Sequence, residues 1–326
     1  MAHMAPKPHY LPAALIGGFG LPEAGRAAGL RHAKVRVRRR QTPDRVFGPV
    51  KAENIAYQYG IYDVDAPSSD LPADFAETMW QEYEGTLPAA IRALEQGTFT
   101  RDDWKSVLLH VQAQSIRHPD YDRVAITYIQ EDGVPSPERD HVQRQRQTTF
   151  RETRQWMANA RFALIRRGTA APRFVLNDKG YIPMHDTQLD LRGVLFPLSG
   201  ETAVLMVVGV ALPTDDYEVG PIAERILNAK GMEIVNQIAW TVPEITCVMG
   251  HPDDADYLLQ LSETGPTVRL PRLGPYGGNR DPGFYHWRWT ASACRLRSKA
   301  RTSDGVPRPP RHGASTGRSR SGRSGQ

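Results

Sequence analysis

Polar and apolar positions alternate near the start of the chain, over residues 33–64, in the manner of half-buried β-strands. Val35 and Val37 would face the core. Arg36 and Arg38 alternate with them and would face solvent on the other side of the strand. The chain is therefore predicted to begin with short strands, and two further ones are expected after a turn, near residues 46–50 and 57–62.

A helical pattern follows these strands. Between Phe75 and Ile91 apolar side chains recur every four residues, which is the stripe of an amphipathic helix. Asp70 is placed to cap the N-terminus of this helix. Gly85 and Pro88 interrupt the stripe, so the segment should either kink or divide into two helices.

Thr100 and Asp103 have the spacing of a capping box, in which each side chain bonds a backbone N–H group of the other residue. A helix should begin there and end at His118-Pro119, because proline disfavours helical geometry in the residue before it. A further helix, rich in Arg and Gln, is predicted over residues 138–163. Its arginines spread around the axis, which indicates a solvated helix or, alternatively, a helix that contacts phosphate groups.

Beyond this helix, apolar runs of strand length alternate with Gly, Pro and Asp. They predict an antiparallel sheet of hairpins, with the Ser199-Gly200-Glu201 turn joining two strands. A helix near 218–238 and a last strand near 242–249 follow. The predicted fold class is α+β, with N-terminal short strands, central helices and a C-terminal antiparallel sheet with a packed helix. The apolar runs lie at residues 162–165, 174–176, 193–198 and 203–210.

Charge is distributed unevenly along the 326 residues, whose net charge is +5. The segment from Pro266 to the end holds 13 Lys or Arg and 2 Asp, which leaves 28 basic and 34 acidic side chains and a net charge of −6 for residues 1–265. The high isoelectric point therefore belongs to the C-terminal segment. It does not indicate that the folded part binds nucleic acid.

Arg, Gly, Pro and Ser dominate residues 266–326, and apolar periodicity is absent there, which predicts a disordered basic tail. Two interpretations of the tail stay open: it binds RNA loosely through charge and stacking, or it is an out-of-frame extension without function. Residues 1–6 are expected to be a disordered start or a tag remnant. A single α+β domain is predicted over residues 7–255.

No apolar run approaches the ~18 residues that span a bilayer, and the N-terminus lacks the layout of a signal peptide. The two cysteines, Cys247 and Cys294, do not suggest a disulfide framework. Cys247 lies in an apolar run and is interpreted as a small buried hydrophobic residue. These features predict a cytoplasmic protein without a membrane partner.

The start of the chain carries an unusual element, His9-Tyr10-Leu11-Pro12, which is followed by Phe19. It resembles the His-Tyr-aliphatic-Pro opening of the bacterial domain-of-unknown-function family 4238. Other pieces that resemble the family follow in the expected order. They are Tyr62, Tyr83-Glu84-Gly85 with Leu87-Pro88, Gln112 to Arg117, Phe174 to Asp178, Val194 to Ser199, and Asn236.

The resemblance covers about residues 7–250. The sequence departs from the family pattern in one loop, where Asn177 replaces a serine and Lys179-Gly180 replace an Asn-Pro pair. Membership of this family implies a bacterial origin and no settled biochemical activity.

Four residues within these pieces are of the types that a hydrolytic or metal-dependent site uses: His9, Glu84, Arg117 and Asp178. Carboxylates hold divalent cations through oxygen ligands, and histidine serves as a base or as a ligand. The four come from separate elements, which is how many active sites are assembled. No motif at fixed local spacing ties them together.

Each of these residues also has a purely structural interpretation. His9 would pin the N-terminal segment by a hydrogen bond, and Asp178 would cap the turn before Gly180. Glu84 would pair with an arginine of a neighbouring helix. Breaking a buried Glu84–Arg117 pair would cost on the order of 3–5 kcal/mol without touching any activity.

Two functions are consistent with these residues. The first is a binding or regulatory module of unknown ligand. The alternative is a metal-dependent hydrolase, foremost a nuclease, with Mg²⁺ or Mn²⁺ near His9, Glu84 and Asp178 and a setting in phage defence or stress response. The partner is unknown. Nucleic acid is one candidate, and it would bind through the Arg-rich tail or through helix 138–163.

Overall fold

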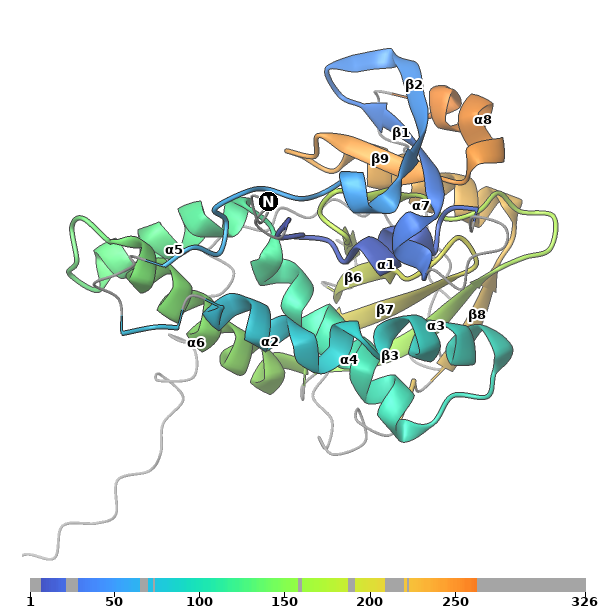
Figure 1. Cartoon of the computed structure of the whole chain (residues 1–326). Helices are drawn as coiled ribbons and strands as arrows, with labels where there is room; N and C mark the ends of the chain where they lie inside the picture. Colours follow the sequence, from blue (N-terminus) through green and yellow to red (C-terminus); the bar gives the residue numbers. More distant parts are fainter. Residues whose placement is uncertain are drawn as a thin grey trace, which may run out of the picture. The chain divides into compact units, whose positions relative to one another are not determined.

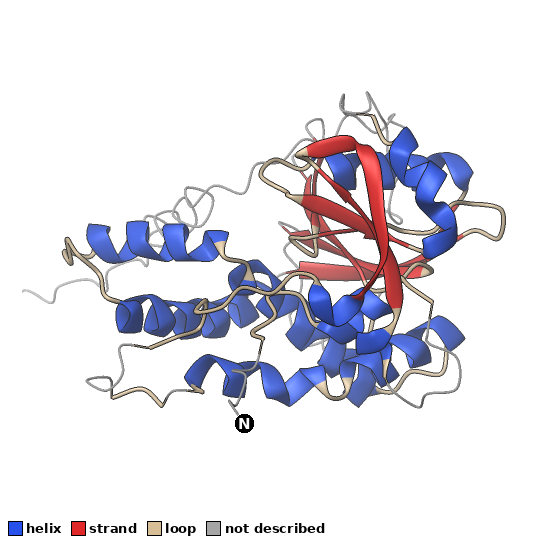
Figure 2. Cartoon of the chain, turned by 45° about the horizontal axis from the view of Figure 1, so that its top comes forward, coloured by secondary structure: helices blue, strands red, loops and turns tan. Residues whose placement is uncertain are grey.

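The structure is a computed structural model that describes residues 7–21, 29–64, 70–72, 74–157, 160–186, 191–208, 220–221 and 223–262. In this part the chain forms eight α-helices and two β-sheets (Figure 1, Figure 2), which is the α+β fold that the sequence predicts. The predicted disordered start at residues 1–6 and the predicted tail at residues 266–326 lie outside the described residues.

The first sheet joins strands from distant parts of the chain in the order β2-β1-β9-β4. β1 (Lys34–Arg39) and β2 (Thr42–Lys51) form an antiparallel hairpin, and β9 (Cys247–Gly250) pairs with the other edge of β1. The two-residue strand β4 (Leu176–Asn177) pairs with β9. Alternation within one strand does not identify its partner, so this union of N-terminal and C-terminal strands was not predicted.

Two expectations for the N-terminal strands are wrong. Near residues 57–62 no strand forms, and Tyr57 makes an isolated bridge with His9 instead. Arg38, expected to face solvent, is buried. The reason is that helices from the C-terminal part of the chain cover the face of the sheet that carries Arg38.

The face that carries Arg38 packs against α7 (Ala229–Thr241) and α8 (Ala255–Gln260). The Arg38 guanidinium lies 4.2 Å from the Trp240 ring of α7. It is kept in a buried place by hydrogen bonds of 2.6–2.8 Å to the carbonyl oxygens of Pro43, Leu258 and Leu261. Arg38 therefore connects the hairpin to the C-terminal helices.

The first helical segment divides as Gly85 and Pro88 predict, into α2 (Phe75–Glu84) and α3 (Leu87–Gln96). The predicted cap is wrong: Asp70 does not cap α2, which begins five residues later. The carboxylate of Asp70 pairs instead with an arginine of a later helix.

The predicted capping box is confirmed at the start of α4 (Arg101–Arg117). The Asp103 N–H donates to Thr100 Oγ1 at 3.2 Å, and the Thr100 N–H donates to the Asp103 carboxylate at 2.8 Å. The helix ends before His118, as expected. A further helix, α5 (Asp120–Glu131), was not predicted; Pro119 ends α4 but suits the beginning of the next helix.

The Arg-rich helix α6 (Arg139–Met157) is shorter than predicted, because the residues after it enter β3 (Ala160–Arg167). Arg146 is fully buried and pairs with Asp122 of α5, and Arg139 pairs with the same carboxylate group at 3.0 Å. This face of α6 is therefore neither solvated nor open to phosphate groups. Each described helix lacks the combination of length and apolar character that a membrane span requires.

The second sheet has the order β5-β6-β7-β3-β8. β5 (Ile182–Asp186), β6 (Leu191–Pro197) and β7 (Thr202–Val208) are antiparallel neighbours, and the turn at 199–201 joins the last two as predicted. β8 (Ala223–Leu227) is added parallel to β3. Hairpins thus make up most of this sheet, and one parallel edge strand completes it.

The helix predicted near 218–238 is wrong at its start. Residues 223–227 form β8, and α7 begins only after Asn228, whose side chain accepts a hydrogen bond from the Gly231 N–H at 2.9 Å. Ile226, which lies within the predicted helix range, is 70% exposed on the edge strand β8.

Candidate functional site

Arg117, the last residue of α4, connects three of the four candidate residues. Its guanidinium donates to Tyr83 Oη at 2.7 Å and pairs with the Glu84 carboxylate at the end of α2. It also donates to the backbone carbonyl of His9 at 2.5 Å. We call these four residues the Arg117 hub. The Glu84–Arg117 pair that the sequence predicts is present, and it extends to the N-terminal segment.

The centre of the hub is a buried charge, the Arg117 guanidinium, which contacts several groups. The Arg117 side chain is 2% exposed, whereas that of Glu84 is 36% exposed. The guanidinium lies 4.9 Å from the Trp80 ring. Burial alone would lower the pKa of Arg117, but Tyr83 and Glu84 outweigh it and raise the pKa well above the ordinary value. Arg117 is therefore charged at neutral pH.

His9 pins the N-terminal segment, as its structural interpretation states. Its Nδ1 lies 2.9 Å from the Lys7 carbonyl oxygen, and its Nε2 lies 3.1 Å from the Glu53 carbonyl oxygen. The next residue continues the attachment, because the Tyr10 N–H donates to the Ala56 carbonyl at 3.0 Å. Burial lowers the pKa of His9, although the two carbonyl contacts raise it. Both ring nitrogens are thus engaged by the backbone of the protein itself.

Asp178 is bonded outside the Arg117 hub. Its Oδ2 accepts hydrogen bonds from the backbone N–H of Thr246 at 2.9 Å and from the Thr246 hydroxyl at 2.5 Å. The carboxylate therefore fastens the turn after β4 to the segment before β9, and the predicted local turn cap is wrong. Its Oδ1 is buried without a hydrogen-bond partner in the described part. Burial raises the pKa of Asp178, although the Thr246 bonds lower it.

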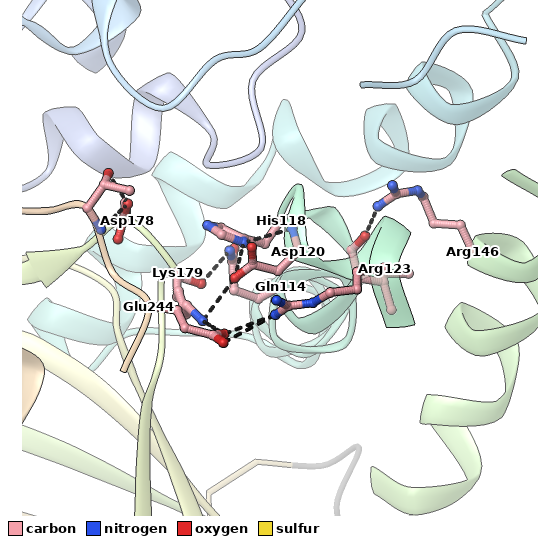
Figure 3. A network of polar contacts seen from close by, with 10 residues as sticks. Gln114, His118, Asp120, Arg123, Arg146, Asp178, Lys179 and Glu244 are labelled. Carbon is pink, nitrogen blue, oxygen red and sulfur yellow. Dashed lines mark hydrogen bonds and ion pairs between the residues drawn. The ribbon is translucent and has the colours of Figure 1, made fainter. Parts of the chain in front are cut away.

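A second polar network, which we call the ionic clamp, consists of His118, Asp120, Arg123, Lys179 and Glu244 (Figure 3). The Lys179 ammonium lies 3.0 Å from the Asp120 carboxylate and 3.4 Å from the Glu244 carboxylate. His118 Nδ1 is 3.3 Å from Asp120, and Arg123 donates to both Glu244 oxygens at 3.2 Å. The clamp joins the start of α5 to the turn after β4 and to the segment before β9.

Backbone geometry supports the clamp at two points. Glu244 has a φ of +64°, a value that few residues other than glycine adopt. Gly180 has a φ of +72°, and a Cβ there would lie 2.5 Å from Leu11 and 2.6 Å from Gln114. Gln114 also donates to the Lys179 carbonyl at 2.9 Å. The loop after β4 therefore needs a glycine at this position.

The contacts of the clamp determine the protonation of Asp120. The His118 hydrogen bond and the nearby Lys179 ammonium hold the pKa of Asp120 well below its usual value, although burial opposes them. The Lys179 side chain is 9% exposed and forms ion pairs with two carboxylates, which offset the cost of its burial. The Asp120 carboxylate therefore stays ionised at neutral pH.

His110 on α4 is a titratable group that sequence reasoning missed. Its side chain is fully buried, and neither ring nitrogen has a hydrogen-bond partner in the described part. Its ring lies 6.0 Å from that of Tyr83. Burial, helped by the charge of Arg117, lowers the pKa of His110 to about 3. The sequence held no signal for it, because the sequence does not show whether a histidine among apolar helix positions has a hydrogen-bond partner.

The four candidate residues therefore do not converge on one point. His9 reaches the hub through its backbone carbonyl rather than its imidazole, and Asp178 belongs to a different set of contacts. Among the described residues, no group of three or more His, Cys, Asp or Glu side chains is arranged to hold a metal ion. The observed hydrogen bonds and ion pairs of these side chains connect segments of the chain to one another.

Comparison of the chain with protein-family models, with curated proteins and with solved structures finds no match. The resemblance to family 4238 and the bacterial origin that it implies stay predictions.

Proposed function

We propose that this chain is a binding or regulatory module without a catalytic centre of its own. The observation that carries the proposal is the Arg117 hub, in which Arg117, Glu84 and the His9 carbonyl are engaged with one another. Residues that would serve as catalysts are used here to fasten the N-terminal segment to the helices. A bacterial and cytoplasmic setting belongs to the same proposal and rests on the sequence features given above.

The two networks have a common effect on the first sheet. The ionic clamp and Asp178 fasten the segment before β9 to the rest of the fold. β9 pairs in register with β1, from Arg36 opposite Gly250 to Arg39 opposite Cys247. The β1–β2 hairpin is thus attached to a fixed strand. A rigid support of this kind suits a surface that recognises a ligand without changing shape.

The alternative of a Mg²⁺- or Mn²⁺-dependent nuclease has less support. It needs the side chains of His9, Glu84 and Asp178 around one metal ion. Each of these side chains contacts a different protein group, namely backbone carbonyls, Arg117 and Thr246 respectively.

We expect the full-length protein to cleave neither RNA nor DNA in Mg²⁺ or Mn²⁺, because no metal cluster is assembled from its described residues. The assay uses end-labelled single strands and duplexes and runs in parallel on His9→Ala and Asp178→Asn variants. The proposal is wrong if the protein cleaves in a metal-dependent way and Asp178→Asn abolishes the cleavage.

A further inference from the structure

The β1–β2 hairpin is strongly basic. Residues 34–51 hold seven Lys or Arg and one Asp, a net charge of +6. Residues 1–265 as a whole have a net charge of −6, so the hairpin is set in a part of the chain whose other residues carry a net charge of −12. Such a contrast orients an approaching polyanion toward the hairpin and away from the rest of the surface.

Part of this charge serves the fold. Arg36, Arg38 and Arg40 contact backbone carbonyl groups or an indole ring of α7. Arg39 and Arg45 are different. Both are exposed, and in the described part neither side chain forms an ion pair or a hydrogen bond with another residue. Their N–H groups are therefore available to a ligand.

Arg39 and Arg45 are held in place by an aromatic ring. Their guanidinium groups lie 5.2 Å and 4.8 Å from the centre of the half-buried Phe47 ring. Phe47 of β2 lies opposite Val37 of β1. Arg39 follows Val37 by two residues, and Arg45 precedes Phe47 by two residues. The contacts of both guanidinium groups with the Phe47 ring place the three side chains together on the hairpin. We call them the Arg39–Phe47–Arg45 patch.

We propose that the Arg39–Phe47–Arg45 patch binds the phosphodiester backbone of a nucleic acid. The inference rests on the proposed function, and it names the ligand class of the binding module. A guanidinium group offers two parallel N–H donors that match two phosphate oxygens. Stacking on Phe47 restricts each arginine before the ligand arrives, so less side-chain entropy is lost on binding.

The position of the patch suits an extended ligand. β2 is the edge strand of the first sheet, so the hairpin has no further strand beside it. At the top of Figure 1 the hairpin carries its turn away from the helices α2 to α4. A phosphate chain lying along this edge would meet both arginines, and an unpaired base would be able to stack on Phe47.

A charge-matched control exists on the same hairpin. Lys34 and Lys51 lie directly opposite each other in the register, one position from Val35 and therefore on the other face. The double variant Lys34→Gln/Lys51→Gln removes the same charge as Arg39→Gln/Arg45→Gln. The basic C-terminal segment stays in all of these proteins and contributes equally to each.

Binding is measured by fluorescence anisotropy on the full-length protein, with oligothymidylate and with a short DNA duplex over a range of KCl concentrations. We expect Arg39→Gln/Arg45→Gln to weaken binding about tenfold and to reduce the slope of log affinity against log salt by about 1.4 for the single strand, because two phosphate contacts are lost. The lysine double variant should stay within about twofold of the unchanged protein. Circular dichroism melting confirms that all variants fold.

The two nucleic-acid forms are distinguished by Phe47→Leu, which removes stacking and keeps an apolar side chain. It should weaken the single strand more than the duplex if bases stack on the ring. Equal affinities of the arginine and lysine double variants would overturn the proposal. So would arginine-dependent binding to anionic lipid vesicles with no arginine dependence on DNA. Either result leaves the proposed function standing, whereas metal-dependent cleavage that Asp178→Asn abolishes would overturn the proposed function whatever the binding shows.

Discussion

Replacement of Arg117 by methionine is expected to lower the free energy of unfolding by about 3–5 kcal/mol. The substitution leaves the Tyr83 hydroxyl and the His9 carbonyl without the donor that now bonds them in a buried place. Methionine fills most of the same space and keeps an apolar contact with Trp80. The main cost is therefore the loss of hydrogen bonds and not an empty cavity. Urea unfolding followed by circular dichroism measures the difference.

Glu84→Gln is the matched control for this change. The Glu84 side chain is 36% exposed, so water solvates it when the pair is weakened. Glutamine also keeps an acceptor oxygen for the guanidinium. We expect a loss of about 1–2 kcal/mol in this variant. A loss in Arg117→Met that is no larger than the loss in Glu84→Gln would mean that the ion pair alone, and not the hub, stabilises this region.

Acidification is expected to destabilise the protein through His110 by about 1.4 kcal/mol for each pH unit below its ordinary pKa. The pKa of His110 falls from 6.5 in the unfolded chain to about 3 in the fold. Between these values the unfolded chain binds a proton that the folded chain does not. The stability that depends on neutral His110 is therefore complete above pH 6.5 and is lost as the pH falls toward 3.

His110→Leu isolates this effect from the carboxylates that titrate in the same range. Leucine is of similar size and removes two buried nitrogens that have no hydrogen-bond partner in the described part, so the unfolding free energy at pH 7 should rise by about 1–2 kcal/mol. The advantage of the variant should grow as the pH falls. Stabilities of the two proteins that run parallel between pH 7 and pH 4 would contradict the buried neutral state.

Local chemistry accounts for the elements that the sequence predicts well. The capping box at Thr100 and Asp103, and the break at Gly85 and Pro88, depend on residues a few positions apart. The turn at 199–201 is equally local. In patterns of this kind the residues that determine the structure lie within the same short segment. The structure therefore confirms these predictions.

Long-range pairing accounts for the elements that were missed. β1 pairs with β9 across about two hundred residues, and β8 adds a parallel edge to β3. Neither alternation nor periodicity states which strand lies beside which. The burial of Arg38 has the same origin, because the helices that cover it come from the other end of the chain.

The candidate site was predictable only in part. Glu84 and Arg117 were expected to pair because they are opposite charges on neighbouring helices, and they do. The His9 carbonyl in the same hub and the Thr246 partner of Asp178 were not predictable. One is a backbone group, and the other lies 68 residues from its partner. A side chain's chemical type indicates what it is able to bind, but only the fold supplies the partner.

The central claim is that the Arg117 hub docks the N-terminal segment, and native-state amide hydrogen exchange on Arg117→Lys tests it most directly. Lysine keeps the charge but lacks the planar fork that reaches both Glu84 and the His9 carbonyl. We expect the amides of Tyr10 and Gln58, which bond Ala56 and Pro8 across this junction, to lose protection by at least about tenfold. Amides that pair β3 with β7 should keep theirs. Unchanged protection at Tyr10 and Gln58 would contradict the claim.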